Sequence, residues 1–205
     1  NLFLAFYEQP GLIHRMMAQW AALMRMAFGL IQRRVTLDVL LMSEDICYRK
    51  GLLVSPEIFN EFLRPYYREV LGRARWRQAL LSLRNPWKHT PRRLHISVDT
   101  DGFAEPAVPL YRALGCDEMH PWEVASGCDV VAAARKWPRL VMMGGIDKRV
   151  LADGKDAIDR HLRAILPPMR ARGGYIPTCD HGVPPDVSLD NYLHYRNRIC
   201  ELDSA

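Results

Sequence analysis

Short apolar segments alternate with helical segments along the chain, and this alternation limits the possible folds more than any other sequence feature. The expected strands are 37–42, 94–98, 115–123, 140–143 and a short one that opens the stretch 172–186. Helices are expected between them: 10–30, one beginning after Ser55, one through 109–114, and a long one from Lys155 to Arg172. Strands separated by helices imply a parallel sheet. The sequence therefore predicts an α/β protein.

Three local details can be predicted within this pattern. The strand 37–42 is expected to be buried, because it contains a continuous apolar run. Ser55 is expected to cap a helix that is interrupted at Pro65, since proline cannot donate a backbone hydrogen bond. Near the C-terminus, Ser188 can cap a further helix.

Composition narrows the class of protein. The chain has 205 residues, 49% of them hydrophobic, which is enough for the core of one domain, 1–205. Its five cysteines are an odd number without paired spacing, so we expect a reducing cytoplasm rather than a disulfide framework. The net charge of +5 is scattered, and the Arg-rich segment 73–93 is interpreted as a solvated helix and loop rather than a nucleic-acid surface. We expect no signal peptide and no membrane span.

The stretch 172–186 places three reactive side chains next to one another. Cys179, Asp180 and His181 follow the short apolar strand directly. In alternating β/α proteins, the loops after the strands carry the chemistry. The alternative is that Asp180 only caps the turn and His181 is a surface residue. We favour a functional cluster, because three such groups occur side by side.

Polar residues also lie on, or directly after, other expected strands. Alternation places His95, Ser97 and Asp99 on one face of the strand 94–98, and a buried polar face is costly unless its groups are paired or used. Glu123 follows the third strand and Asp147 the fourth. The Gly144-Gly145 pair before Asp147 allows a close approach of the backbone, although it is a weak phosphate-binding signal by itself.

These motifs together carry a resemblance to a known family. The segments are His95-Ile96-Ser97-Val98-Asp99-Thr100-Asp101-Gly102, Pro121-Trp122-Glu123, Gly144-Gly145-Ile146-Asp147-Lys148 and Gly173-Gly174-Tyr175-Ile176-Pro177 through Asp186. In this succession the chain resembles the uroporphyrinogen decarboxylase superfamily over nearly its whole length. The resemblance implies a (β/α)8 TIM barrel, present here as roughly its last five βα units. The first units of the barrel are not expected in this chain.

The resemblance implies roles for individual residues. His181 matches a histidine that lines the tetrapyrrole pocket of the decarboxylase, and Asp147 matches an aspartate of a Gly-Asn-x-Asp segment. The expected catalytic residues, each at or just beyond the C-terminal end of a strand, are His181, Asp147, Glu123 and His95. The expected substrate-binding residues are Asp99, Gly145, Asp180 and Tyr175.

A zinc site is a further implication of the resemblance. In the methyltransferase branch of the superfamily, a His-x-Cys pair and a late cysteine bind zinc, which activates a thiol acceptor. His95 matches that histidine, but Ser97 stands where the cysteine would be. A mixed site of His95, Cys179 and His181, with Glu123, has ligand types that zinc accepts.

Three functions stay open at this point. The segments 174–177 and 187–192 resemble the methyltransferase-like branch, which implies corrinoid-linked methyl transfer at the barrel mouth and a corrinoid protein as partner. The first alternative is cofactor-free decarboxylation of a uroporphyrinogen in porphyrin biosynthesis, and the second is a non-catalytic barrel that binds a tetrapyrrole or a partner. Because a partial barrel has open sheet edges, we also expect a tendency to homo-oligomerise and no activity of the isolated fragment.

Overall fold

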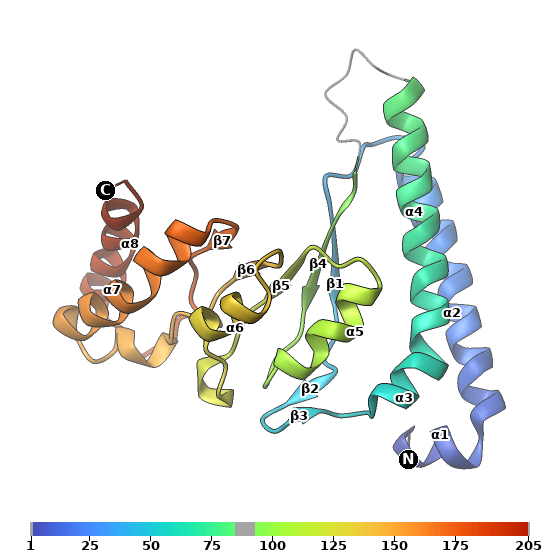
Figure 1. The fold of residues 1–205 in the computed structure, drawn as a ribbon, viewed down its shortest axis with the longest axis horizontal. Coiled ribbons are helices and arrows are strands. Elements are labelled where there is room, and N and C mark those ends of the chain that lie inside the picture. The colour runs from blue at the N-terminus through green and yellow to red at the C-terminus, as the bar shows by residue number, and fades with distance from the viewer. Residues whose placement is uncertain (1, 85–92, 205) are drawn as a thin grey trace. The chain divides into compact units, whose positions relative to one another are not determined.

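The computed structural model describes residues 2–84 and 93–204 (Figure 1). The chain forms two compact units. The first unit comprises residues 1–41, 54–96 and 109–116, and the second comprises 42–53, 97–108 and 117–205.

The predicted strands and helices occur in the predicted order, and the structure adds helices at 2–8 and 130–136 and a hairpin at 47–52. The α-helices are α1 (Leu2–Glu8), α2 (Pro10–Ile31), α3 (Pro56–Ile58), α4 (Arg64–Arg84), α5 (Val108–Ala113), α6 (Val130–Lys136), α7 (Lys155–Arg172) and α8 (Leu189–Ser204). The strands are β1 (Val39–Ser43), β2 (Cys47–Tyr48), β3 (Gly51–Leu52), β4 (His95–Asp99), β5 (Glu118–His120), β6 (Val141–Met143) and β7 (Tyr175–Ile176). A π-helix, η1 (Phe59–Leu63), and 3-10 helices η2 (Glu105–Ala107), η3 (Val124–Ser126) and η4 (Lys148–Leu151) complete the described elements.

The main sheet has the strand order β1-β4-β5-β6-β7. The pairs β4–β5, β5–β6 and β6–β7 are parallel, with Val98 opposite Met119 and Met142 opposite Tyr175. Backbone bonds from His95 N to Asp38 O and from Glu44 N to Asp99 O give β1 the same direction as β4. The predicted α/β class with a parallel sheet is thereby confirmed, and it is consistent with part of a (β/α)8 barrel.

Strand β1 is buried on one face only. Leu40 and Met42 are buried, whereas Val39 and Leu41 are 52% and 57% exposed. Successive side chains of a strand point to opposite faces, and this edge strand neighbours β4 alone in the sheet. The prediction of a buried strand therefore holds for one face of β1 only.

The first unit is held together by contacts between α2 and α4, which run side by side (Figure 1). The Gln32 side chain donates to Ala74 O at 2.9 Å, and the Arg77 guanidinium donates to Arg25 O at 3.0 Å. Trp20 meets Tyr67 edge to face, with ring centroids 5.0 Å apart. Aromatic packing and side-chain hydrogen bonds therefore both join the two helices.

Pro65 does not break its helix. The Ser55 hydroxyl accepts from Ile58 N at 3.2 Å, as predicted for a cap, and the chain then stays helical from α3 through η1 into α4. A proline lacks the N–H and its ring crowds the carbonyl of the preceding turn. The wider π-helical turn of η1 lies at that place, so the expected interruption takes the form of a change in helix type.

The Arg-rich segment 73–93 is partly structural. Residues 73–84 lie on α4, where the Arg75 guanidinium donates to Leu114 O at 3.1 Å and also to Gly115 O. Residues 85–92 of this segment lie outside the described residues. Among the helices within 2–84 and 93–204, none combines the length and apolarity needed to cross a bilayer.

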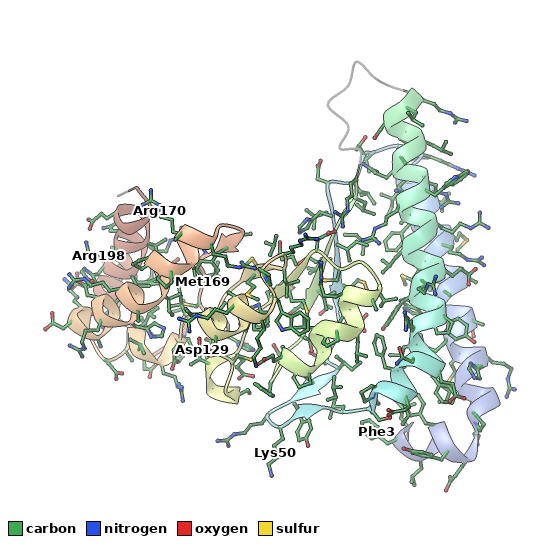
Figure 2. All side chains as sticks on the ribbon, viewed as in Figure 1. Phe3, Lys50, Asp129, Met169, Arg170 and Arg198 are labelled. Atoms are coloured by element: carbon green, nitrogen blue, oxygen red, sulfur yellow. The ribbon has the colours of Figure 1, made fainter. Side chains whose placement is uncertain are left out.

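In the second unit, α7 and α8 pack against each other, and α7 has the predicted bounds. Met169 on α7 is buried, next to Arg170 on the same helix, and Arg198 projects from α8 (Figure 2). The Arg198 and His194 side chains both contact the Asp159 carboxylate, at 3.1 and 2.8 Å. Ser188 caps α8 as predicted, since its hydroxyl accepts from Asn191 N at 3.1 Å.

In the loop after β6, the backbone at Gly144 lies close to the backbone at Pro121. Gly144 has a φ of +104°, and an added Cβ would lie 2.0 Å from Pro121 O; Gly127 has a φ of +94° with nothing within 4 Å. Both alanine variants should lose about 1 kcal/mol because of their left-handed backbone. Gly144→Ala should lose a further ~1–3 kcal/mol from the steric overlap. Urea unfolding of the two variants measures this difference, and equal losses would contradict the described approach.

Candidate functional site at the carboxyl ends of the strands

A cleft of about 510 Å³ lies at the loops that follow β4, β5 and β6. The β2–β3 hairpin contributes to the same wall, and all lining residues belong to the second unit. They are Cys47, Tyr48, Arg49, Asp101, Gly102, Glu123, Ala125, Ser126 and Arg149. The cleft thus occupies the place where parallel β/α proteins carry their chemistry.

Glu123 lines the cleft as an ionised group. Its Oε2 accepts from Gly102 N at 2.9 Å and from the Ser126 hydroxyl at 2.7 Å. Burial acts to raise the pKa of Glu123, but these hydrogen bonds and the charges of His181 and Lys148 together lower it below its ordinary value. We therefore expect Glu123 to stay ionised and to accept hydrogen bonds rather than to donate a proton.

Asp147 positions Arg149 on the cleft wall. The carboxylate caps η4 through Arg149 N at 3.0 Å, and it accepts from Arg149 Nε at 2.9 Å and from Nη2 at 2.7 Å. These bonds from Arg149 lower the pKa of Asp147. From α7, His161 Nε2 accepts from Asp147 N at 3.0 Å, and burial lowers the pKa of His161, which suits an unprotonated acceptor nitrogen. Asp147, expected to be catalytic, is engaged here in orienting an arginine.

His181 is paired with a second carboxylate at the cleft. Its Nε2 lies 2.9 Å from Asp101 Oδ1, and Asp101 lines the cleft with about half of its side chain exposed. The Nδ1 atom of His181 is buried without a hydrogen-bond partner within the described residues. A proton on Nε2 therefore satisfies the ring better than one on Nδ1, because only Nε2 faces an acceptor.

Asp180 joins the loops that surround the cleft. Its side chain is fully buried, with Oδ2 accepting from Val124 N at 2.9 Å and Oδ1 accepting from Lys148 N at 3.2 Å. Its own N–H donates to Ile146 O at 2.9 Å. The enclosed carboxylate and its bonds to backbone amides favour a role in holding the loops, and the substrate-binding role of Asp180 stays a prediction.

Gly145 and Tyr175 lie outside the cleft lining. An added Cβ on Gly145 would lie 2.7 Å from Val130 Cβ, so this glycine allows α6 to pack closely rather than exposing backbone to a ligand. The Tyr175 hydroxyl donates to Gly144 O at 2.7 Å, and burial raises its pKa. Tyr175 instead lines a separate cavity of about 220 Å³ at the end of α7. Neither expected substrate contact is supported by this arrangement.

His95 and Asp99 lie at opposite ends of β4. Asp99 ends the strand, with its Oδ1 3.5 Å from Nδ1 of the neighbouring His120. His95 is the first residue of β4 and belongs to the first unit. Four residues of a strand span roughly 13 Å, so the expectation that His95 lies at the carboxyl end was wrong. The catalytic role of His95 and the substrate role of Asp99 stay predictions.

The zinc ligands that the resemblance implied do not fit a metal in this arrangement. Cys179 bonds to the Tyr195 hydroxyl of α8, and burial raises its pKa, which favours the thiol over the thiolate that zinc requires. His181 faces Asp101, and the Ser97 hydroxyl donates to Glu118 at 2.9 Å. No group of three His, Cys, Asp or Glu side chains within 2–84 and 93–204 could hold a metal ion.

Glu123 alone among the nine lining residues was predicted as a site residue, and four of the other eight bear on the chemistry of the cleft. Asp101 and Ser126 support His181 and Glu123, whereas Arg49 and Arg149 bring positive charge. Asp101 lies within the motif 95–102, and Arg149 directly follows the motif 144–148. Arg49 had no such signal, because its place depends on the β2–β3 hairpin.

The buried carboxylate of Asp180 provides one test. Asp180→Asn keeps the shape but replaces one acceptor oxygen by a donor that faces a backbone N–H. The variant should lose about 1–3 kcal/mol of unfolding free energy, since one buried amide is left unpaired. Asp186→Asn, at an exposed position nearby, should change stability by less than about 0.5 kcal/mol. Equal effects in chemical denaturation would show that Asp180 does not hold the loops.

The lowered pKa of Asp147 provides a second test. Because the folded state binds this proton less readily, the carboxylate stabilises the fold above its unfolded pKa of about 4, and the effect is lost as the pH falls through the lower folded pKa. Asp147→Asn keeps a capping side chain, so at pH 7 it should cost only about 0.5–1 kcal/mol, as for a partly exposed ion pair. This cost should shrink in acid. Asp153→Asn, which is exposed, is the control; a cost that is the same at pH 3 and pH 7 would contradict the ion-pair argument.

Comparison with known proteins now identifies the family. The family model described as uroporphyrinogen decarboxylase (URO-D) matches residues 1–201. A comparison with curated proteins gave no match. The match extends over nearly the whole chain, and it agrees with the parallel sheet and with the loops at its carboxyl edge. The chain therefore belongs to the uroporphyrinogen decarboxylase (URO-D) family.

Proposed function

We propose that the cleft is the acid–base part of an active site for corrinoid-linked methyl transfer. Membership in the URO-D family supports an enzyme of the decarboxylase or methyltransferase kind. The observation that carries the proposal is the His181–Asp101 pair at the cleft, with 2.9 Å between Nε2 and Oδ1. The resemblance of 174–177 and 187–192 to the methyltransferase-like branch supports methyl transfer as the reaction.

The Asp101–His181 pair suits proton exchange with a leaving group. When a methyl group leaves an oxygen, sulfur or nitrogen atom, that atom needs a proton. Asp101 faces the cleft and can contact the leaving atom, while the ring of His181 exchanges the proton with the carboxylate. A corrinoid, bound by a partner protein, would accept the methyl group.

Glu123 has a different role in the same cleft. Its lowered pKa keeps it ionised, so it offers a fixed negative charge and an acceptor to the ligand. Two carboxylates with separate environments, one exchanging protons with an imidazole and one held negative, are the pattern of acid–base sites. Asp180 and Asp147 position the loops and Arg149 around them.

Decarboxylation of a uroporphyrinogen is the second candidate, and the arginines favour it. Arg49 and Arg149 line the cleft and suit a ligand that carries carboxylates. In that reaction an acid protonates the pyrrole-methylene carbon, and a placed carboxylate stabilises the cationic ring. Asp101 with His181 would supply the acid, and Glu123 the carboxylate.

The test uses the complete gene product that contains this chain. Reduced cobalamin and methyl ethers, methyl thioethers or methylamines are mixed with the protein, and methylation is followed by absorbance. In a parallel assay, uroporphyrinogen is supplied without cobalamin and carboxylate loss is measured. His181→Gln and Asp101→Asn should reduce the methylation rate by about 10²–10⁴-fold, whereas Asp186→Asn should leave it unchanged.

The two assays separate the candidates. Methylation that depends on His181 supports the proposal. Turnover of uroporphyrinogen without cobalamin would replace it with decarboxylation. Binding of a tetrapyrrole with neither activity would leave a non-catalytic binding barrel as the function.

A further inference from the structure

Arg149 is held in one orientation but keeps part of its guanidinium uncommitted. An arginine has five N–H donors in a planar fork. The contacts to Asp147 use Nε and Nη2, at 2.9 and 2.7 Å. Within the described residues no hydrogen bond uses the Nη1 atom, and 60% of the side chain is exposed. The edge formed by Nη1 and the second Nη2 hydrogen is thus oriented in advance and accessible.

The charges along the cleft restrict what this edge can bind. Arg49 and Arg149 bring two positive charges to the lining, and Asp101 and Glu123 bring two negative charges. Both acids already have partners, in His181 and in the Gly102 and Ser126 donors, so they do not neutralise the free edge of Arg149 directly. Asp147 already offsets the charge of Arg149, and the two lining carboxylates repel a dianion more strongly than a monoanion, so the free edge suits a group with a single negative charge.

We propose that Arg149, oriented by Asp147, is the residue that binds a carboxylate group of the ligand in this cleft. A carboxylate is planar and singly charged, and it matches the parallel donors of a guanidinium edge. A phosphate would require further donors and carries more charge. The proposal rests on the proposed function only in taking the cleft as the ligand site, and it holds for either reaction.

The experiment measures binding without turnover. Propionate is titrated into the ¹⁵N-labelled complete protein, and the Nε–Hε resonance of Arg149 is followed by NMR. We expect a saturable shift with a Kd on the order of millimolar, as befits a single charged group. Arg149→Gln should weaken binding at least about tenfold, and Arg149→Lys should weaken it as well, since an ammonium cannot form the paired contact.

Two further variants make the result specific. Arg163→Gln, at an exposed arginine on α7 that is also paired with an aspartate, should bind propionate as the unmodified protein does. Asp147→Asn should bind more weakly although Arg149 is retained, because the guanidinium is no longer fixed. The thermal unfolding midpoint of each variant verifies that it is folded.

Three outcomes would overturn the proposal. They are no saturable shift at Arg149, an equal loss in Arg163→Gln, or tighter binding of inorganic phosphate than of propionate. Absence of methyl transfer and of decarboxylation, with propionate binding intact, would refute the proposed function and leave this inference standing. Activity without propionate binding would refute this inference and leave the proposed function standing.

Discussion

The site depends on one buried carboxylate. Asp180 is fully enclosed, and its two oxygens accept from the backbone of the loops after β5 and β6, at Val124 and Lys148. A buried charge is tolerated only when hydrogen bonds replace its hydration, so these bonds fix the distance between the loops as well as satisfying the carboxylate. Glu123 and Arg149 lie next to the bonded amides. Asp180 therefore sets the width of the cleft without lining it.

Much of the fold could be predicted from the sequence, because it depends on residues that are close to one another in the chain. The alternation of strands and helices, the bounds of α7 and the Ser55 and Ser188 caps follow from periodicity and from side-chain hydrogen bonding over a few residues. The burial of β1 could not be predicted in the same way. An apolar run shows that a strand can be buried, but its position at the sheet edge decides how much of it is buried.

The site was predictable in place but only partly in role. Glu123, Asp147 and His181 lie, as predicted, in loops after the strands, and these loops form or adjoin the candidate cleft; their functional roles stay predictions. Their roles depend on partners that are distant in the sequence, such as His161 for Asp147 and Tyr195 for Cys179. Family motifs name the residue types but do not show which ones are saturated by the backbone.

The contact between α7 and the loop after β6 exists only in one protonation state. His161 accepts the Asp147 N–H through Nε2, and its pKa is lowered mainly by burial, although the Asp147 and Asp180 carboxylates oppose this. A lowered folded pKa means that the contact is complete above the ordinary histidine pKa and is lost as the pH falls through the folded value. Acid would then turn the acceptor into a donor that faces another donor. A single proton therefore links the helix to the orientation of the cleft arginine.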